Sequence, residues 1–433
     1  HVLKFYQRQG MKKVVMVMMA WMMMPAVADM QEDINAIESQ MLEWRRHIHQ
    51  NPELSNREFK TAAYVEQHLK ALGMEVQTDI AFTGVVGVLK GDLPGPVLAL
   101  RADMDALPVN EQVDLSFASK VTAEYRGETV GVMHACGHDT HVAILMAAAE
   151  VFAKNKDQLA GTLMFIFQPA EEGAPGDEEG GAELMLAEGL FNDLKPEAVF
   201  GLHVTSSMNT GMIGYRTGPM MAAVDDFELK VIGRQTHGSR PWGGIDPIVT
   251  SAQIINAVQT IVARRTDVTR APAVVSFGAI KGGIRNNIIP DDVTMVGTIR
   301  NFDMDIRDNI HHQLGNIVEH VAHAHEADVE FKINEGYPVT VNDPALGERM
   351  MPTLHKVFGE DQVIDPGLIT GAEDFSYLAN EVPGLYFFMG VTPVDQDAST
   401  APTNHSPLFY VDETALLNGV KAFVQLVMDY SAP

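Results

Sequence analysis

Cysteine is nearly absent from this chain, because Cys136 is the only one among 433 residues. A single thiol excludes a framework of disulfide bonds within the chain, so the fold must be stabilised by its hydrophobic core. The length is sufficient for two or three domains, and the hydrophobic content of 46% is ordinary for a globular protein.

Basic residues are also few, since 31 lysines and arginines stand against 57 aspartates and glutamates, a net charge of −26. Binding of nucleic acid requires a basic surface, so this balance argues against a nucleic-acid partner. It equally disfavours an anionic membrane surface. Neither class of partner is therefore expected.

Long apolar runs are absent after residue 28, where none reaches 18 residues, so no membrane-spanning helix is predicted there. Before that point, two lysines precede an apolar run from Val14 to Met24 and a small-residue site at 26–28, which is the layout of a secretory signal peptide. We expect residues 1–10 to be an upstream extension, 11–28 a signal peptide, and the protein to be exported, either periplasmic or secreted. A buried N-terminal helix is the alternative.

An unpaired thiol in an oxidising compartment is a liability unless it is buried or bound to metal. Cys136 lies in the stretch "MHACGHDTH", beside His138 and Asp139. This crowding indicates either a metal ligand or a nucleophile.

Short apolar strands alternate with amphipathic helices in the first half of the chain. Strands are predicted at 97–100, at 163–167 and in "EAVFGLHV", and a helix is predicted from "HDTHV" onward with Asp139 or Thr140 as its N-cap. This alternation predicts an α/β domain with a central mixed, largely parallel sheet flanked by helices. Polar residues follow the strands, at the edge where sites form in open α/β sheets.

A different pattern occupies residues 218–334, where a strand, a helix (247–265), two strands, a helix (304–326) and a strand follow one another. The order βαββαβ predicts a small α+β, ferredoxin-like unit with both helices on one face. The α/β pattern then resumes. We predict a discontinuous main domain, 29–217 and 335–433, with the smaller domain inserted at 218–334.

Metal-ligating side chains cluster at the predicted strand and helix ends and in one late loop. They are Asp103, Asp105, Cys136, His138, Glu171, Glu172, His203 and His405. Thiolate, imidazole and carboxylate together suit a divalent ion such as Zn²⁺, and they exceed what one tetrahedral ion needs. A two-metal site would use them all. A Cys–His nucleophile pair leaves the glutamates and His203 unexplained, and each residue alone has a purely structural alternative.

The neighbouring carboxylates in "AEEG" would need different roles. Adjacent residues on an irregular loop point in different directions, so one can ligate metal while the other faces a metal-bound water. Because metal binding lowers the pKa of that water, a carboxylate within hydrogen-bond reach can accept its proton.

These residues stand in motifs that resemble a known family, the two-metal hydrolases that include glutamate carboxypeptidases and aminoacylases. The resemblance is closest to the amidohydrolase branch, which contains N-acyl-amino-acid amidohydrolases, hippurate hydrolases and indole-acetyl-amino-acid hydrolases. It runs from about residue 34 to 430 through the ordered motifs "RADMDALP", "MHACGHD", "QPAEEG", "GLHV", "GGIRNNIIP", "GTIR", "GAEDF" and "NHSP". It implies a zinc-exopeptidase-like main domain and an inserted lid or dimerisation domain.

The resemblance also implies a ligand set. Cys136 would bridge two divalent ions (Zn, Mn, Co or Ni), with His138 and His203 on one ion and Glu172 and His405 on the other. Glu171 would be the general base, and Asp105 would orient a ligand histidine. Asp103 stands where the wider family carries a metal-binding histidine, a departure typical of the amidohydrolase branch.

In the inserted domain, the resemblance implies that His237 stabilises the oxyanion, often from the partner subunit of a homodimer. Asn287 and Arg300 would hold the substrate carboxylate. Trp242 departs from the pattern of the branch, which bears on the choice of acyl group. The segment 304–326 carries several histidines, and we interpret it as a surface helix and not as a metal site.

The expected function is that of an exported, metal-dependent amidohydrolase acting on N-acyl amino acids. One alternative is a dipeptidase or carboxypeptidase of the same family. Another, of a different class, is a non-catalytic secreted protein that binds metal or amino acids, because a fold does not guarantee its chemistry.

Overall fold

A computed structural model describes residues 30–432, which fall into two compact units. The first contains the chain up to Tyr215, Asp343–Asp365 and the residues from Val382 onward. The second contains Arg216–Asn342 and Pro366–Glu381. The expected extension at 1–10 and signal peptide at 11–28 lie outside the described residues.

The second unit is larger than the stretch 218–334 that periodicity indicates, because strand pairing draws in distant segments. Strand β9 (Gly218–Met221) pairs antiparallel with β16 (Thr340–Asn342), and Met221 forms a further bridge with Ile369. Pairing of this kind leaves no local pattern in the sequence.

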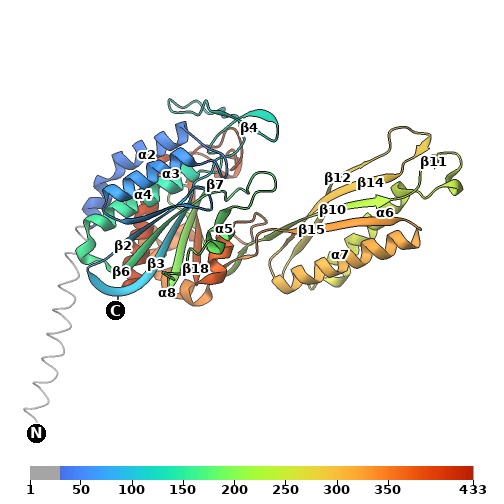
Figure 1. The fold of residues 1–433 in the computed structure, drawn as a ribbon. Helices are drawn as coiled ribbons and strands as arrows, with labels where there is room; N and C mark the ends of the chain where they lie inside the picture. The colour runs from blue at the N-terminus through green and yellow to red at the C-terminus, as the bar shows by residue number, and fades with distance from the viewer. Residues whose placement is uncertain (1–29, 433) are drawn as a thin grey trace, which may run out of the picture. The chain divides into compact units, whose positions relative to one another are not determined.

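The first unit is built on an eight-stranded mixed sheet. The central strands β6, β3, β7 and β18 run parallel, and the flanking strands add antiparallel pairs at both sides (Figure 1). The predicted mixed, largely parallel sheet is thus confirmed. In spatial order the strands are β1 (Glu75–Ile80), β2 (Gly84–Lys90), β6 (Ala160–Gln168), β3 (Leu93–Asp103), β7 (Ala198–Asn209), β18 (Gly384–Thr392), β8 (Ile213–Gly214) and β17 (Val363–Ile364).

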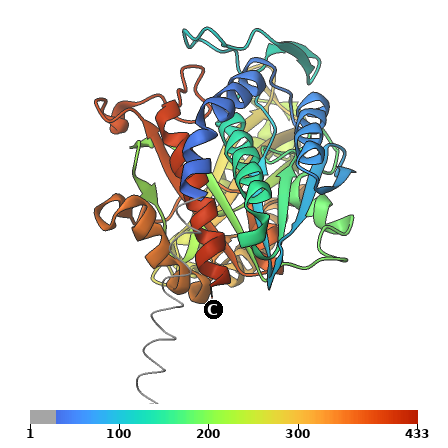
Figure 2. The same ribbon diagram turned by 90° about the vertical axis from the view of Figure 1, so that its left-hand side faces the viewer.

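Helices cover this sheet and explain the apolar character of its strands. Every residue of β18 is buried, as expected for a strand covered on both faces. Helix α4 (His138–Lys154) packs on β3, β6 and β7 through an alanine-rich surface. Around it, in front of the sheet in Figure 2, lie α2 (Glu38–Gln50), α3 (Phe59–Ala71) and α10 (Leu416–Ser431). The unit also contains α5 (Gly181–Ala187) and α8 (Pro344–Phe358).

The start of α4 differs from the prediction that Asp139 or Thr140 is its N-cap, which is wrong. The helix begins at His138, preceded by Gly137 at φ +89°, and no described side chain caps it. The carboxylate of Asp139 is bonded instead to Arg45 Nε at 2.8 Å and His49 Nδ1 at 2.9 Å, both on α2. Asp139 therefore forms a long-range ion pair with α2 and does not cap its own helix.

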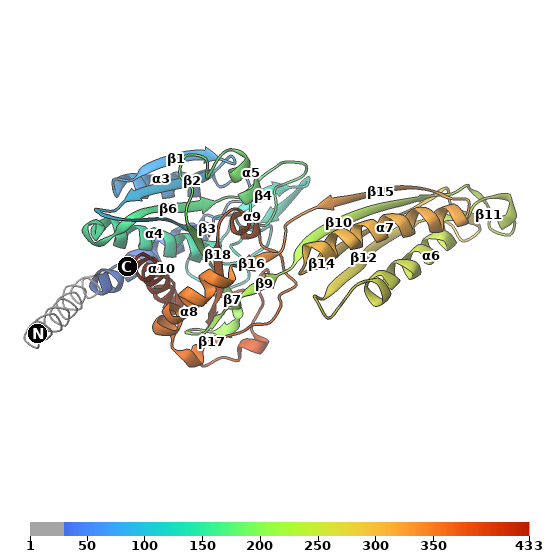
Figure 3. The same ribbon diagram turned by 90° about the horizontal axis from the view of Figure 1, so that it is seen from below.

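The second unit contains a four-stranded antiparallel sheet in the ferredoxin-like order predicted from the sequence. Figure 3 shows α6 (Pro247–Thr260) and α7 (Met304–Ala324) side by side over it. After Thr260 the chain continues as a π-helix, Ile261–Arg265, so the helix expected over 247–265 changes its winding. The strands are β12 (Ala273–Gly282), β14 (Asp292–Asn301), β10 (Ala223–Ile232) and β15 (Asp328–Glu335).

A buried charge cluster joins α7 to this sheet. Asp225 on β10 accepts hydrogen bonds from Arg307, including one from Nε at 3.0 Å, and lies 2.7 Å from His311 Nε2.

Among residues 30–432, no helix is long and apolar enough to cross a bilayer.

We predict that Asp225→Asn destabilises the protein by about 3–5 kcal/mol near neutral pH, because it leaves Arg307 buried without its counter-charge. Burial alone would raise the pKa of Asp225, but hydrogen bonds from His311 and Arg307 outweigh it and hold the pKa at about 2, below its ordinary 3.8. The stabilising charge is therefore present above about pH 4 and is lost as the pH falls toward 2. Urea unfolding at a series of pH values should show the variant's deficit shrinking over that interval.

Asp226→Asn is the matched control, since Asp226 is the next residue on β10 and is exposed. Its effect should stay within about 0.5 kcal/mol at every pH. Equal losses in the two variants would contradict the role given to Asp225.

Candidate active site

The thiol of Cys136 lies at the centre of a cluster of potential metal ligands in the first unit. Its Sγ is 3.3 Å from His203 Nε2 and 3.3 Å from His405 Nε2. His405 Nε2 lies 3.0 Å from Glu172 Oε1. Two donor sets share the sulfur, Cys136–His138–His203 and Cys136–Glu172–His405, and within each set the ligand atoms lie within 4.8 Å of one another.

The ring orientations of His138 and His203 present the same atom to this cluster. His138 Nδ1 lies 2.8 Å from the carbonyl oxygen of Asp105, and His203 Nδ1 lies 2.7 Å from that of Val204. A carbonyl oxygen only accepts, so Nδ1 must carry the proton in both rings. In the neutral ring, the lone pair of Nε2 is then available to a metal ion.

The charges around the cluster favour a bound cation. Burial, then the carboxylates of Glu172 and Glu171, raise the pKa of the Cys136 thiol well above its ordinary value. Burial lowers the pKa of His138, but Asp103 and Asp105 outweigh it and raise that pKa to about 10. A metal ion bound here would displace both protons, which makes binding tighter at higher pH.

The carboxylate of Asp105 holds the loop that carries the two glutamates. It accepts the backbone N–H groups of Glu171 and Glu172, each at 3.0 Å, and the hydroxyl of Ser55 at 2.7 Å. Ala170, just before them, adopts φ +52° and donates its N–H to Glu58. The loop is thus held in a strained conformation by buried carboxylates.

Glu171 and Glu172 then take different environments. Glu172 pairs with His405 and is only partly buried. Glu171 is buried, and its Oε2 lies 3.8 Å from His138 Nε2. Glu172 belongs to the set that shares Cys136 Sγ with His405, whereas Glu171 groups with His138 and Glu172 and, separately, with Asp103 and Glu373.

Asp103 belongs to a group of hydrogen-bonded side chains next to this cluster. Arg101 donates to it at 2.7 Å, and His141 Nδ1 lies 2.5 Å from its other oxygen. His141 Nε2 accepts the N–H of Val204 at 2.9 Å, so the proton of a neutral ring must be on Nδ1. Asp103, His138 and His141 could also surround one ion, but both ring nitrogens of His141 already have protein partners. Asp103 and His141 therefore support the residue that follows His203.

Sequence reasoning missed two supporting side chains. Asn404 donates its amide to the carbonyl oxygens of Cys136, at 3.2 Å, and Val204, at 3.0 Å, which ties three site loops together. Its position next to His405 in "TNHSP" was an available signal. Ser55, which donates to Asp105, stands in a segment with no motif to mark it.

The other predicted residues lie in the second unit. His237 on β11 (Thr236–His237) pairs with β13 (Ile288–Ile289), and Gly238 donates its N–H to the carbonyl of Asn287 at 2.8 Å. The backbone N–H and hydroxyl of Ser239 both approach His237 Nδ1, so Nε2 carries the proton and is a donor. Arg300 lies on β14, where burial lowers the pKa of its guanidinium against the opposing effect of Asp226.

Comparison with known proteins decides the family. The sequence model of peptidase family M20/M25/M40 matches residues 99–429. The chain belongs to this family. The resemblance stated from the motifs is thereby confirmed.

Relatives in this M20 family support the same chemistry. Thermostable carboxypeptidase 2 of Saccharolobus solfataricus is 42% identical over 94% of this chain and 100% of its own length. The N-acetyl-L-cysteine deacetylase of Bacillus subtilis is 38% identical over 89% of this chain and 86% of its own. A dinuclear metal-binding peptidase of the M20 family from Bacillus subtilis has a similar structure, with a TM-score of 0.74 and 33% identity over 91% and 98% of the two chains. This M20 protein is a hydrolase acting on amide bonds, and the predicted enzyme class is confirmed.

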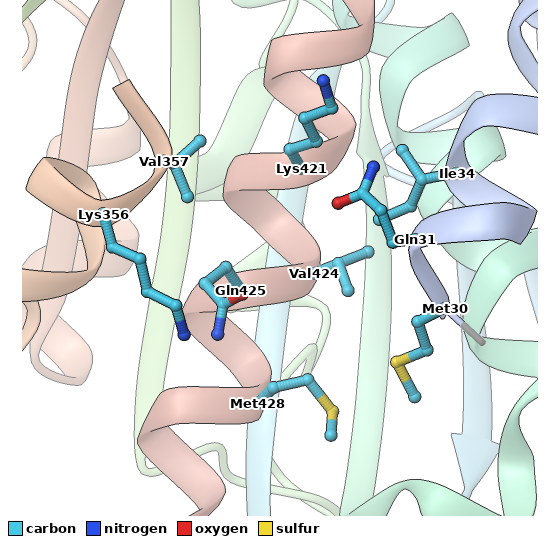
Figure 4. Close-up of a pocket in the computed structure, with 9 residues that line it drawn as sticks. All are labelled: Met30, Gln31, Ile34, Lys356, Val357, Lys421, Val424, Gln425 and Met428. Atoms are coloured by element: carbon cyan, nitrogen blue, oxygen red, sulfur yellow. The ribbon is translucent and has the colours of Figure 1, made fainter. Parts of the chain in front are cut away.

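A cavity elsewhere in the first unit lacks the groups that hydrolysis requires. It has a volume of about 350 Å³ and lies between α8, α10 and the first described residues (Figure 4). Apolar side chains, two glutamines and the lysines Lys356 and Lys421 line it, without a described histidine, cysteine or carboxylate. The Cys136 cluster is therefore the candidate active site.

We predict that Gly137→Ala disturbs this site. A Cβ at Gly137 would lie 2.3 Å from Val204 Cγ2, and φ is +89°. Gly127→Ala is the matched control, with φ +82° and no atom within 4 Å of the added carbon. Both changes incur backbone strain, but only the first adds overpacking, so it should lose about 1–3 kcal/mol more in urea unfolding.

Equal losses in the two alanine variants would contradict a rigid contact between Gly137 and Val204. A larger loss at Gly137 should be accompanied by weaker metal retention after dialysis, because Val204 follows the candidate ligand His203.

Proposed function

We propose that this M20 hydrolase cleaves the amide bond of N-acyl amino acids and holds two divalent metal ions. Cys136 would bridge the ions, with His138 and His203 on one and Glu172 and His405 on the other. The observation that carries the proposal is the pair of donor sets sharing Cys136 Sγ, with the buried carboxylate of Glu171 beside them. Zn²⁺, Mn²⁺, Co²⁺ and Ni²⁺ all suit this mixture of ligands.

When bound, such ions polarise the substrate carbonyl and lower the pKa of water. Glu171 accepts a proton from the attacking water as its oxygen bonds to the carbonyl carbon. The carbon–nitrogen bond then breaks, and Glu171 returns the proton to the leaving amine. The products are a carboxylate and a free amino acid.

Residues of the second unit complete the proposed reaction. The Nε2–H group of His237 donates to the carbonyl oxygen as negative charge develops there. In the proposed homodimer, each subunit supplies this histidine to the active site of the other. Loss of such a donor typically lowers the rate about 10²–10³-fold. Asn287 and Arg300 hold the carboxylate of the amino acid, for which a guanidinium offers a charged, bidentate grip. Asp105 positions the loop of Glu171 and Glu172 through their backbone N–H groups.

A peptidase activity is the second candidate, because a relative 42% identical to this chain is named a carboxypeptidase. Turnover of N-acetyl dipeptides and uncapped dipeptides separates the two activities, since an amidohydrolase of this kind requires the acyl cap.

We also propose export, supported by the lysines, apolar run and small residues before Asp29. A mature protein beginning near Asp29 in the periplasm would support it.

We predict that Glu171→Ala lowers kcat for N-acyl amino acids by about 10²–10⁴-fold, because the proton acceptor is lost. The metal content should not change, since the ligands remain. Release of free amine and metal content after dialysis are measured together, with Zn²⁺, Mn²⁺ or Co²⁺ restored after chelation.

Glu179→Gln is the control, because Glu179 is an exposed acid eight residues along the chain. It should retain the parent rate. Near-native turnover by Glu171→Ala would overturn the mechanism, and loss of metal would reassign Glu171 as a ligand.

A further inference from the structure

Three successive backbone N–H groups run through the loop of the two site glutamates, and two buried carboxyl groups accept all three. Asp105 accepts those of Glu171 and Glu172, each at 3.0 Å. Glu58 accepts that of Ala170 through Oε1, at 2.9 Å. The proposed reaction so far gives Glu58 no part, although Glu58 holds the residue directly before the proposed proton acceptor.

Glu58 reaches this loop from a distant part of the chain. It directly precedes α3, and 112 positions separate it from Ala170. Its other oxygen, Oε2, lies 2.6 Å from the hydroxyl oxygen of Thr83, which stands between β1 and β2. Glu58 therefore joins the start of α3, the β1–β2 turn and the glutamate loop.

The contact at Ala170 falls on the strained point of the loop. Ala170 adopts φ +52°, a conformation that a residue with a Cβ keeps only where its surroundings hold it. Ala170 is also buried, so loss of its partner would leave an N–H group unsatisfied. Because Glu171 follows directly, relaxation at Ala170 would displace the carboxylate of Glu171.

The surroundings of Glu58 favour a neutral carboxylic acid. Glu58 is fully buried, and no described lysine, arginine or histidine pairs with it. Arg57, the cation next to it in the chain, donates to Glu178 instead. Asp105 is a second buried acid near Glu58, and like charges at one site disfavour ionisation of both. Asp105 is the better stabilised anion, because it accepts three hydrogen bonds from Ser55 and the loop.

A neutral acid satisfies both partners of Glu58. Its carbonyl oxygen accepts the N–H of Ala170, and its hydroxyl can donate to Thr83 Oγ1, because a threonine hydroxyl both donates and accepts. Burial, then the charge of Asp105, raise the pKa of Glu58 from 4.5 to about 8 against the hydrogen bonds from Thr83 and Ala170. The neutral form therefore predominates at neutral pH.

We propose that Glu58 is a positioning residue for the glutamate loop and that it acts as a neutral carboxylic acid, accepting from Ala170 and donating to Thr83. It acts through the backbone of Ala170 on the direction of the Glu171 carboxylate. The catalytic part of this role rests on the proposed function.

Three substitutions in the metal-loaded full chain separate a neutral acid from an anion. Glu58→Gln offers a carbonyl oxygen to Ala170 and an amide donor to Thr83, so kcat for N-acyl amino acids should stay within about twofold of the parent. Glu58→Asp is too short to span both partners, and Glu58→Ala loses both. These two should lower kcat about 10–100-fold, with KM within about twofold of the parent. Metal content after dialysis should not change, because Asp105 still holds the two glutamates.

Glu53→Ala is the matched control. The side chain of Glu53 also holds the start of α3, by accepting the N–H groups of Lys60 and Thr61, but it makes no described contact with the glutamate loop. Its loss should lower stability without lowering kcat. Parent-like kcat in Glu58→Ala would overturn the positioning role, and a loss in Glu58→Gln as large as in Glu58→Ala would overturn the neutral acid.

Urea unfolding tests the neutral acid without a substrate and remains available if Glu58→Ala does not fold. An acid whose pKa is raised by folding lowers stability as the pH increases, because the unfolded chain ionises first. The parent should therefore lose stability relative to Glu58→Gln from about pH 4.5 to about pH 8, and the difference should level off above that range.

A difference between parent and Glu58→Gln that stays constant over this range would overturn the neutral acid. The expected trend without turnover of any N-acyl amino acid would instead refute the proposed function and leave Glu58 as the neutral anchor of the loop.

Discussion

The carboxylate of Asp105 accepts the Ser55 hydroxyl and the N–H groups of both Glu171 and Glu172, while its own carbonyl oxygen accepts His138 Nδ1. One residue just after β3 therefore holds the position of the glutamate loop and the ring orientation of His138, a proposed ligand. Because these bonds are buried, a small displacement of Asp105 would leave several polar groups unsatisfied. The geometry of the cluster therefore depends on this residue.

Concentrating acids around one thiol is unfavourable unless positive charge compensates them. Asp103 has its own compensation in Arg101 and His141. Around Cys136, burial and the two glutamates raise the pKa of the thiol, so the negative surroundings of the sulfur favour bound positive charge. The two donor sets that share Cys136 Sγ are the geometric support for the two-metal proposal.

Part of the candidate site was predictable, because Asp105, Glu171 and Glu172 follow the neighbouring buried strands β3 and β6, whose carboxyl ends meet at one edge of the sheet. The prediction at Asp139 failed because capping rules consider only local bonds, whereas Arg45 and His49 approach from α2. Residues 366–381 were not assigned to the second unit because one bridge at Ile369 gives no periodicity. Ser55 was missed for a similar reason, since its partner Asp105 lies fifty residues away.

The sequence by itself determined the kinds of chemistry available: one thiol, a set of histidines and carboxylates in ordered motifs, and the alternating strands and helices that carry them. These follow from composition and from short-range periodicity, which are properties of neighbouring residues. Only the tertiary structure decided which nitrogen each histidine presents and that both ring nitrogens of His141 have protein partners. Those features depend on contacts between segments distant in the chain, and such contacts exist only once the chain has folded.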